Sequence, residues 1–107
     1  MDKSFRLGLE SEENVYLALR RTRRDGDISW FKRTKRKSKE DMAGIAFMVW
    51  YKRLMIPLQV KSSEWYKREH EERYGDSIYC VVGQGPNLLP RIKQALRDYV
   101  RKIREQS

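Results

Sequence analysis

Gln59 and Lys61 are the two side chains whose types and spacing most clearly allow chemistry. They lie near the end of an apolar stretch, Gly44–Ser63 (GIAFMVWYKRLMIPLQVKSS), which has the length of two adjacent strands. Side chains alternate between the faces of a strand, so an amide and an ammonium group two positions apart share one face. Leu58 and Val60 then point the other way, towards a core. An ammonium group binds phosphate, and an amide carbonyl can ligate a hard cation.

Apolar periodicity predicts helices and strands on both sides of this hairpin. The first helix is expected over residues 11–24, with Ser11 as its N-cap and Glu12 in its first turn. The hairpin consists of two strands, residues 45–51 and 54–60, joined by a turn near Lys52 and Arg53. The remaining elements are a strand over 28–31, a helical connection over 62–74, a strand over 77–82 and a helix over 88–105. This order predicts an α/β fold.

Three further features of the sequence predict local structure. The run Ser77–Val82 is almost continuously apolar, which is typical of a central strand buried on both faces. Pro57 lacks an N–H group, so we expect it at a sheet edge, a bulge or the start of a strand. Cys80 is the single cysteine, which rules out an intramolecular disulfide and favours a small buried filler over a catalytic thiol.

Length and charge narrow the class of protein. A chain of 107 residues has room for one modest core, so residues 1–107 form a single domain. The formal net charge of +9 attracts polyanions, of which nucleic acid is favoured over an acidic membrane. The sequence contains neither an apolar run long enough to span a bilayer nor a signal peptide at its N-terminus. We therefore expect a cytoplasmic protein with no membrane partner.

A dense cluster of positive charge lies between residues 32 and 39, KRTKRKSK. Six basic residues without an acidic one are more than a packed element tolerates, so this segment is either a solvated loop or a phosphate-binding surface. The density favours phosphate contact, which positions a duplex without reading its sequence. The nucleic-acid-binding residues predicted on this basis are Lys32, Arg33, Lys35, Arg36, Lys37 and Lys39.

The element order, together with GIAF at residues 44–47 and PLQVKSS at residues 57–63, resembles the PD-(D/E)XK nuclease superfamily. This superfamily includes restriction endonucleases and archaeal Holliday-junction resolvases. The resemblance implies a restriction endonuclease-like fold, in which helices flank a central four-stranded mixed sheet. It also implies an Mg²⁺-dependent endonuclease that acts on DNA more readily than on RNA, and that pairs as a homodimer to cut two strands.

The resemblance also assigns roles to individual residues. Glu12 matches the glutamate of the first helix, and Lys61 matches the lysine that orients the attacking water or steadies developing charge. Gln59 occupies the position of the second acidic ligand. The implied catalytic residues are thus Lys61, Gln59 and Glu12, and the implied Mg²⁺ ligands are Glu12 and Gln59. Ala46 stands where the family has an aspartate, and a methyl group offers no ligand to a cation.

Position 46 therefore leaves several interpretations open. The chain belongs to an endonuclease lineage whose catalysis has been lost or removed, or it is a non-catalytic DNA- or RNA-binding module that uses the same groove and the basic segment. Asp41 would replace the missing carboxylate only if an unusual backbone path brought it to the metal. Natural decay and deliberate replacement of aspartate would leave the same alanine. A weaker alternative is a small assembly or regulatory protein with an acidic protein partner.

Aromatic residues and the single histidine have ordinary structural explanations at this stage. Trp30, Trp50 and Trp65 could stack on unpaired bases, but tryptophan in the strands of a small domain is more often part of the core. Trp65 has the most polar surroundings of the three. His70 stands among charged residues, so we expect a solvated histidine in preference to a general base.

Overall fold

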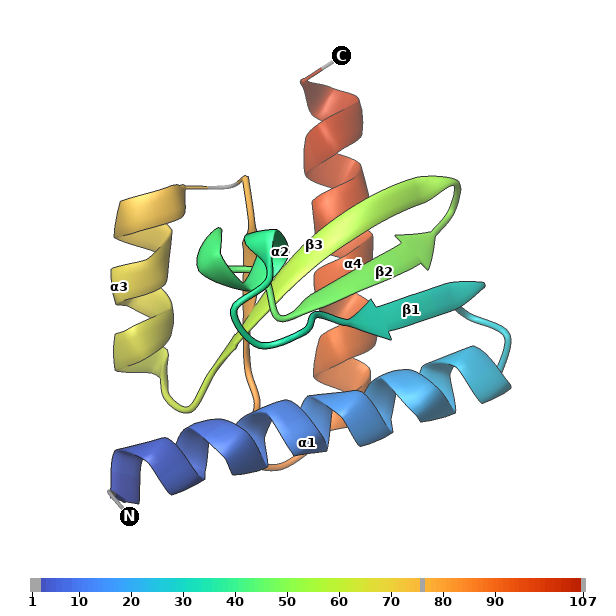
Figure 1. Cartoon of the computed structure of the whole chain (residues 1–107). Helices are drawn as coiled ribbons and strands as arrows, with labels where there is room; N and C mark the ends of the chain where they lie inside the picture. Colours follow the sequence, from blue (N-terminus) through green and yellow to red (C-terminus); the bar gives the residue numbers. More distant parts are fainter. Residues whose placement is uncertain (1–2, 76, 107) are drawn as a thin grey trace.

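The computed structural model describes residues 3–75 and 77–106, and it shows an α/β domain with a mixed four-stranded sheet (Figure 1). Its helices are α1 Lys3–Arg24, α2 Lys39–Met42, α3 Glu64–Tyr74 and α4 Leu88–Glu105. Its strands are β1 Trp30–Arg33, β2 Phe47–Tyr51, β3 Leu54–Lys61 and β4 Tyr79–Val82. The strands lie in the order β1-β2-β3-β4, in which β1, β2 and β3 are antiparallel and β4 runs parallel to β3. The predicted α/β class and four-stranded mixed sheet are confirmed.

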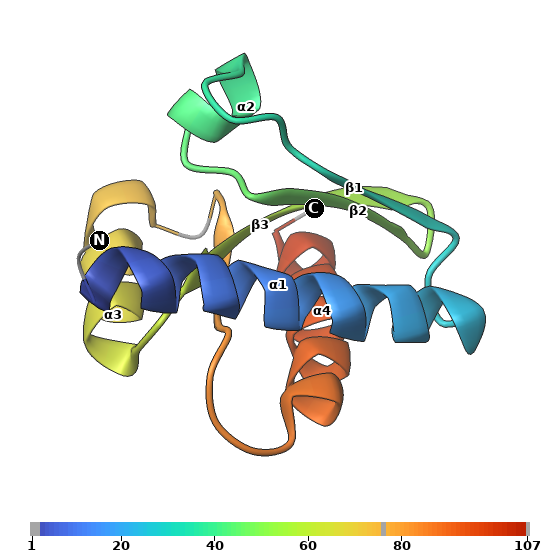
Figure 2. The same cartoon turned by 60° about the horizontal axis from the view of Figure 1, so that its bottom comes forward.

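The two long helices lie on one side of the sheet. Figure 2 shows α1 and α4 below the strands and α2 above them, while α3 stands beside the end of the sheet. The core fills the space between α1, α4 and the near face of the sheet. Its members on the helices and on the two central strands are Val15, Ala18, Leu19, Ile92, Ala95, Leu96, Val100, Phe47, Val49, Tyr51, Ile56, Leu58 and Val60.

Helix α1 begins well before the predicted N-terminus, so the assignment of Ser11 as an N-cap is wrong. Ser11 is fully buried in the middle of the helix, and its hydroxyl donates to the carbonyl of Leu7 at 2.6 Å. A serine that bonds back to the preceding turn is compatible with a helix interior. The small side chain is needed because α1 crosses the end of β4 at this point. The amide of Gln84 donates to the Ser11 hydroxyl at 3.0 Å.

The central hairpin follows the prediction closely. Lys52 and Arg53 have φ angles of 47° and 66°, and two successive residues in the left-handed region are typical of a tight type I′ turn. β4 pairs only with Leu58–Lys61, so Pro57 lies where that side of β3 has no neighbour. The missing N–H of Pro57 is therefore compatible with the sheet, as expected for a local edge.

The last strand lies at the edge of the sheet, which corrects the prediction of a central strand. β4 has β3 on one side and no strand on the other. Its apolar composition has a different cause, because both α3 and α4 contact this strand. Cys80 is buried in this strand as predicted. A continuous apolar run thus indicates that other elements cover the strand. It does not indicate how many strands lie beside it.

Strand β1 starts two residues later than predicted, and the tryptophans are not core residues. Phe31 turns inward, where its ring meets those of Tyr16 and Phe47 at centroid distances of 5.7 and 6.5 Å. Because successive side chains of a strand point to opposite faces of the sheet, Trp30 faces outward and is 41% exposed. Trp50, its partner in the ladder, is 36% exposed. The neighbouring, smaller side chains of Phe31 and Val49 face the core in place of the two indoles.

We expect Gly83→Ala to destabilise the fold, because Gly83 packs directly against the backbone of α1. An added Cβ would lie 2.4 Å from the Ser11 carbonyl oxygen, and relieving that overlap requires α1 to move away from β4. We expect a loss of about 1–3 kcal/mol in the free energy of unfolding. Urea unfolding followed by circular dichroism would measure this loss.

Gly8→Ala is the matched control for Gly83→Ala. Nothing lies within 4 Å of an added Cβ at Gly8, in the same helix, so alanine should raise stability by about 1 kcal/mol through its higher helix propensity. Equal effects of the two substitutions would contradict the close packing of α1 against Gly83.

Candidate functional site

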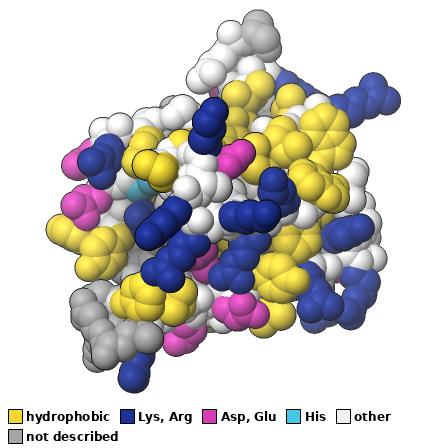
Figure 3. Space-filling model, viewed as in Figure 1, with side chains coloured by type: hydrophobic (Ala, Val, Ile, Leu, Met, Phe, Trp, Pro, Cys, Tyr) yellow, Lys and Arg dark blue, Asp and Glu magenta, His cyan; other side chains and the backbone are white. Residues whose placement is uncertain are grey.

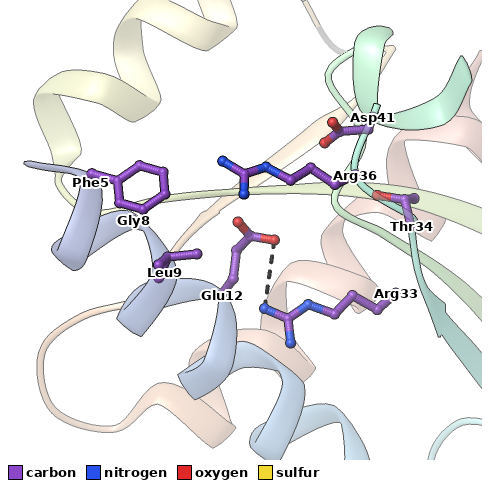
Figure 4. A pocket seen from close by; sticks show the side chains of 8 residues that line it. All are labelled: Phe5, Gly8, Leu9, Glu12, Arg33, Thr34, Arg36 and Asp41. Carbon is purple, nitrogen blue, oxygen red and sulfur yellow. Dashed lines mark ion pairs between the residues drawn. The ribbon is translucent and has the colours of Figure 1, made fainter. Parts of the chain in front are cut away.

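Glu12 lies in an open pocket between α1 and the segment that links β1 to α2 (Figure 4). Its carboxylate is 3.9 Å from the Arg33 guanidinium, which also pairs with Glu13 at 3.3 Å. Arg33 in addition lies over the rings of Tyr16 and Phe47. The residues lining the pocket are Phe5, Gly8, Leu9, Glu12, Arg33, Thr34, Arg36 and Asp41.

Burial raises the pKa of Glu12 above its usual value. The positive charges of Arg33, Arg36 and Lys61 act in the opposite direction, whereas the carboxylate of Asp41 raises the pKa further. The Arg36 side chain reaches across the pocket between Asp41 and Glu12 in the view of Figure 4. Two carboxylates and two guanidinium groups thus line one pocket, and Glu12 is the carboxylate that forms an ion pair there.

Gln59 and Lys61 share a second pocket, which lies between the end of β3 and α3. Leu58 and Val60 are buried in the core, so the predicted alternation along this strand is confirmed. The side-chain carbonyl of Gln59 accepts a hydrogen bond from the backbone N–H of Val60 at 2.9 Å. The other lining residues of this second pocket are Gly44, Tyr66, Glu69, His70, Arg73 and Tyr74.

The structure places Glu12 in one pocket and the Gln59–Lys61 pair in the other, with Ala46 hydrogen-bonded to both sides. The backbone carbonyl of Ala46 accepts from Thr34, which lines the Glu12 pocket, at 2.9 Å. Its N–H group donates to the carbonyl of Leu58, the neighbour of Gln59, at 2.7 Å. The positive charge of Lys61 acts on a group in each pocket. It partly opposes burial, which raises the pKa of Glu12, and it adds to burial in lowering the pKa of His70.

The donors that are present fit Mg²⁺ poorly. Magnesium takes oxygen ligands in nearly octahedral geometry, with at least one or two carboxylates. Glu12 is paired with arginine, and the Gln59 carbonyl already accepts a backbone hydrogen bond. Among residues 3–75 and 77–106, no three His, Cys, Asp or Glu side chains gather closely enough to hold a metal ion. The site as it stands is better suited to an anion than to a divalent cation.

Asp41 comes closer to Glu12 than its position in the sequence suggested. It belongs to the single-turn helix α2, whose N-cap Ser38 accepts from the Asp41 N–H. The Asp41 carboxylate in turn accepts from the backbone N–H of Lys37 at 2.8 Å. The Ser-x-x-Asp spacing of a capping motif was the signal for this turn. Asp41 therefore lies in the Glu12 pocket, but its carboxylate is engaged in holding the turn.

The predicted basic cluster divides into two groups. Arg33 and Arg36 face the Glu12 pocket, and Arg36 lies over the Phe5 ring at 5.5 Å. The lysines of the cluster are exposed, namely Lys32, Lys35, Lys37 and Lys39. Figure 3 shows Lys and Arg side chains gathered in the middle of this face of the molecule. A further groove between α1 and β1, lined by Tyr16, Arg20, Arg23, Arg24, Phe31 and Arg33, extends the positive surface.

His70 is buried, which corrects the prediction of a solvated histidine. It is 3% exposed, its ring lies 4.7 Å from that of Tyr74, and its Nε2 is 3.1 Å from the carbonyl oxygen of Ile78. A carbonyl only accepts, so Nε2 carries the proton and donates. The polar sequence around His70 belongs to the outer face of α3, whereas His70, the buried residue of this helix, joins α3 to the chain before β4.

We expect His70 to reduce stability at acidic pH. Burial lowers the pKa of His70 from its ordinary value of 6.5, so the unfolded chain takes up this proton at a higher pH than the folded protein does. The contribution of neutral His70 is complete above about pH 6.5 and is lost as the pH falls towards the folded-state pKa. Urea unfolding of wild type and His70→Gln over this range isolates the effect from that of the carboxylates. If the stabilities of wild type and His70→Gln fell in parallel with decreasing pH, the predicted effect of His70 would be contradicted.

Comparison with family models, with curated proteins and with solved structures found no match. Within residues 3–75 and 77–106, no helix combines the length and the apolar character needed to cross a membrane.

Proposed function

We propose that this chain is a nucleic-acid-binding domain of the Mg²⁺-dependent endonuclease type, in which the alanine at position 46 has removed metal-dependent cleavage. The element order and the Gln59–Lys61 pair are the features that resemble the PD-(D/E)XK nucleases. The single observation that carries the proposal is the position of Ala46, which is hydrogen-bonded to the margins of both the Glu12 pocket and the Gln59–Lys61 pocket.

A carboxylate at position 46 would change the local balance of charge. Ala46 is 4% exposed and belongs to the apolar core cluster, so an added carboxylate would be largely desolvated and would require a cation beside it to stay charged. By resemblance to the family, Glu12 and Gln59 are the residues proposed to supply the other oxygen ligands. With alanine in place, Lys61 and the neighbouring arginines bind phosphate without a metal.

Ala46→Asp is expected to create Mg²⁺-dependent cleavage of DNA. Aspartate restores the carboxylate that the resembling family has at this position, so cleavage should depend on Mg²⁺ and disappear with EDTA. Duplex, branched and unpaired DNA should each be incubated with the variant and with wild type, and the products separated by electrophoresis.

Ala46→Asn is the matched control, since asparagine has nearly the size of aspartate but no charge. It should remain inactive on all three substrates. If Ala46→Asp fails to cut any substrate while retaining the wild-type circular dichroism spectrum, catalysis is not part of this site. The domain is then a non-catalytic binding module.

The second candidate function, a non-catalytic DNA- or RNA-binding module, is favoured by the way the pocket groups are already engaged. Glu12 pairs with Arg33, and Gln59 accepts from Val60. In the part of the chain that the structure describes, the side chains of the exposed lysines between β1 and α2 form no such ion pair or hydrogen bond. Under either function these lysines neutralise phosphates and release counterions, so affinity falls steeply with added salt.

Replacing Lys35 and Lys37 by Gln is expected to weaken binding to a DNA duplex and to flatten its salt dependence. Each phosphate contact contributes about 0.9 to the slope of log K against log salt, so the slope should decrease by roughly two. Titration of a fluorescent duplex at several salt concentrations would measure this slope.

The Arg97→Gln, Arg101→Gln protein is the control, because it removes the same charge from α4 on the other side of the sheet. It should leave the slope nearly unchanged. Equal effects of the two double variants would mean that net charge alone attracts DNA. Absence of any binding at low salt would instead favour an acidic protein partner.

A further inference from the structure

A row of large, exposed side chains crosses the outer face of the sheet, away from α1 and α4. Trp30 is paired with Trp50 in the β1–β2 ladder, and Trp50 with Met55 in the β2–β3 ladder. Directly opposite residues project to the same side of a sheet. The three side chains are 41%, 36% and 39% exposed, so they form a continuous apolar row in contact with solvent. We call it the tryptophan row.

A second row lies beside the tryptophan row on the same face. It consists of Lys32, Met48 and Pro57, which are paired with one another in the same two ladders. Two residues along a strand separate the rows by about 6.7 Å. The first row is thus bounded by an exposed lysine that belongs to the basic segment. Figure 3 shows hydrophobic side chains gathered next to Lys and Arg side chains on this face.

The two indoles do not belong to the core cluster. The core lies on the opposite face, where Phe31, Val49 and Ile56 pack inward from the same strands. Within residues 3–75 and 77–106, no aromatic ring contact or cation–π contact involves the ring of Trp30 or Trp50. Trp65, by comparison, packs its ring edgewise against Tyr66 at 5.0 Å. The row therefore presents partly exposed indole rings beside a positive surface.

We infer that the tryptophan row is a stacking platform for the bases of an unpaired nucleic-acid strand. Every base has a π-face, and aromatic side chains beside a basic track are how proteins hold single strands without reading sequence. The net charge of +9 disfavours a second copy as the occupant and favours a polyanion. Figure 2 shows α2 and its basic flanking segment on this same side of the sheet, where they would hold the strand's phosphates.

This inference rests on the proposed function for the class of partner, and it adds the form that the partner takes. Bases in a duplex are already stacked on one another, so their faces are not available to the indoles. The platform therefore predicts a preference for unpaired over paired strands. The basic segment alone would bind both.

The test measures the affinity of the full chain for a fluorescent homothymidine oligonucleotide and for a duplex of equal length by fluorescence anisotropy. Trp30→Ala and Trp50→Ala should each weaken binding of the unpaired strand by roughly 5- to 150-fold, because stacking contributes about 1–3 kcal/mol per base. Affinity for the duplex should stay within about twofold of wild type. Trp50→Phe, which keeps an aromatic face, should retain most of the affinity.

Trp65→Ala is the matched control, since it removes an exposed indole from α3 and should leave both affinities unchanged. Unchanged binding of the unpaired strand by Trp30→Ala and Trp50→Ala would overturn the inference. So would an equal loss on the duplex, or a dimer in sedimentation experiments that only these two substitutions dissociate, which would assign the face to a second copy. If wild type binds neither nucleic acid at low salt, the proposed function fails with it.

Discussion

The antiparallel register between β2 and β3 is the constraint on which the rest of the structure depends. Phe47 faces Leu58 in this register, and both are fully buried. A slip of one residue would turn every side chain of one strand to the opposite face. It would drive Gln59 and Lys61 into the core and expose Leu58. The hydrophobic effect thus fixes the polar pocket indirectly, by requiring the apolar partners between its members to point inward.

The same register produces two faces of opposite character. The inner face carries the aliphatic core and the ring of Phe31, on which α1 and α4 pack. The outer face carries Trp30 and Trp50 together with the basic side chains that follow β1. An exposed apolar patch is uncommon on a small domain, and the proposed stacking of unpaired bases would account for the two indoles there.

Charge is distributed so that repulsion within the positive surface stays limited. Arg33 is the clearest case, because it pairs with Glu12 and Glu13 while its guanidinium lies over the rings of Tyr16 and Phe47. Lys93 likewise holds Asp25 and Asp27 at the end of α1. In the described part of the chain, five acidic side chains form ion pairs with a nearby lysine or arginine, namely Glu12, Glu13, Asp25, Asp27 and Asp98. The lysines between β1 and α2 remain available to an external anion.

The amino-acid sequence by itself determined the α/β class, the β2–β3 hairpin with its turn at Lys52 and Arg53, and the common face of Gln59 and Lys61. These features follow from alternation and from turn chemistry, which act between residues close in the chain. Tertiary structure alone decided which side chains are covered. Packing of α1 against Gly83 buries Ser11. Helices α3 and α4 cover the apolar edge strand β4, and the orientation of β1 leaves Trp30 exposed. These outcomes depend on contacts between distant segments, and local patterns do not encode them.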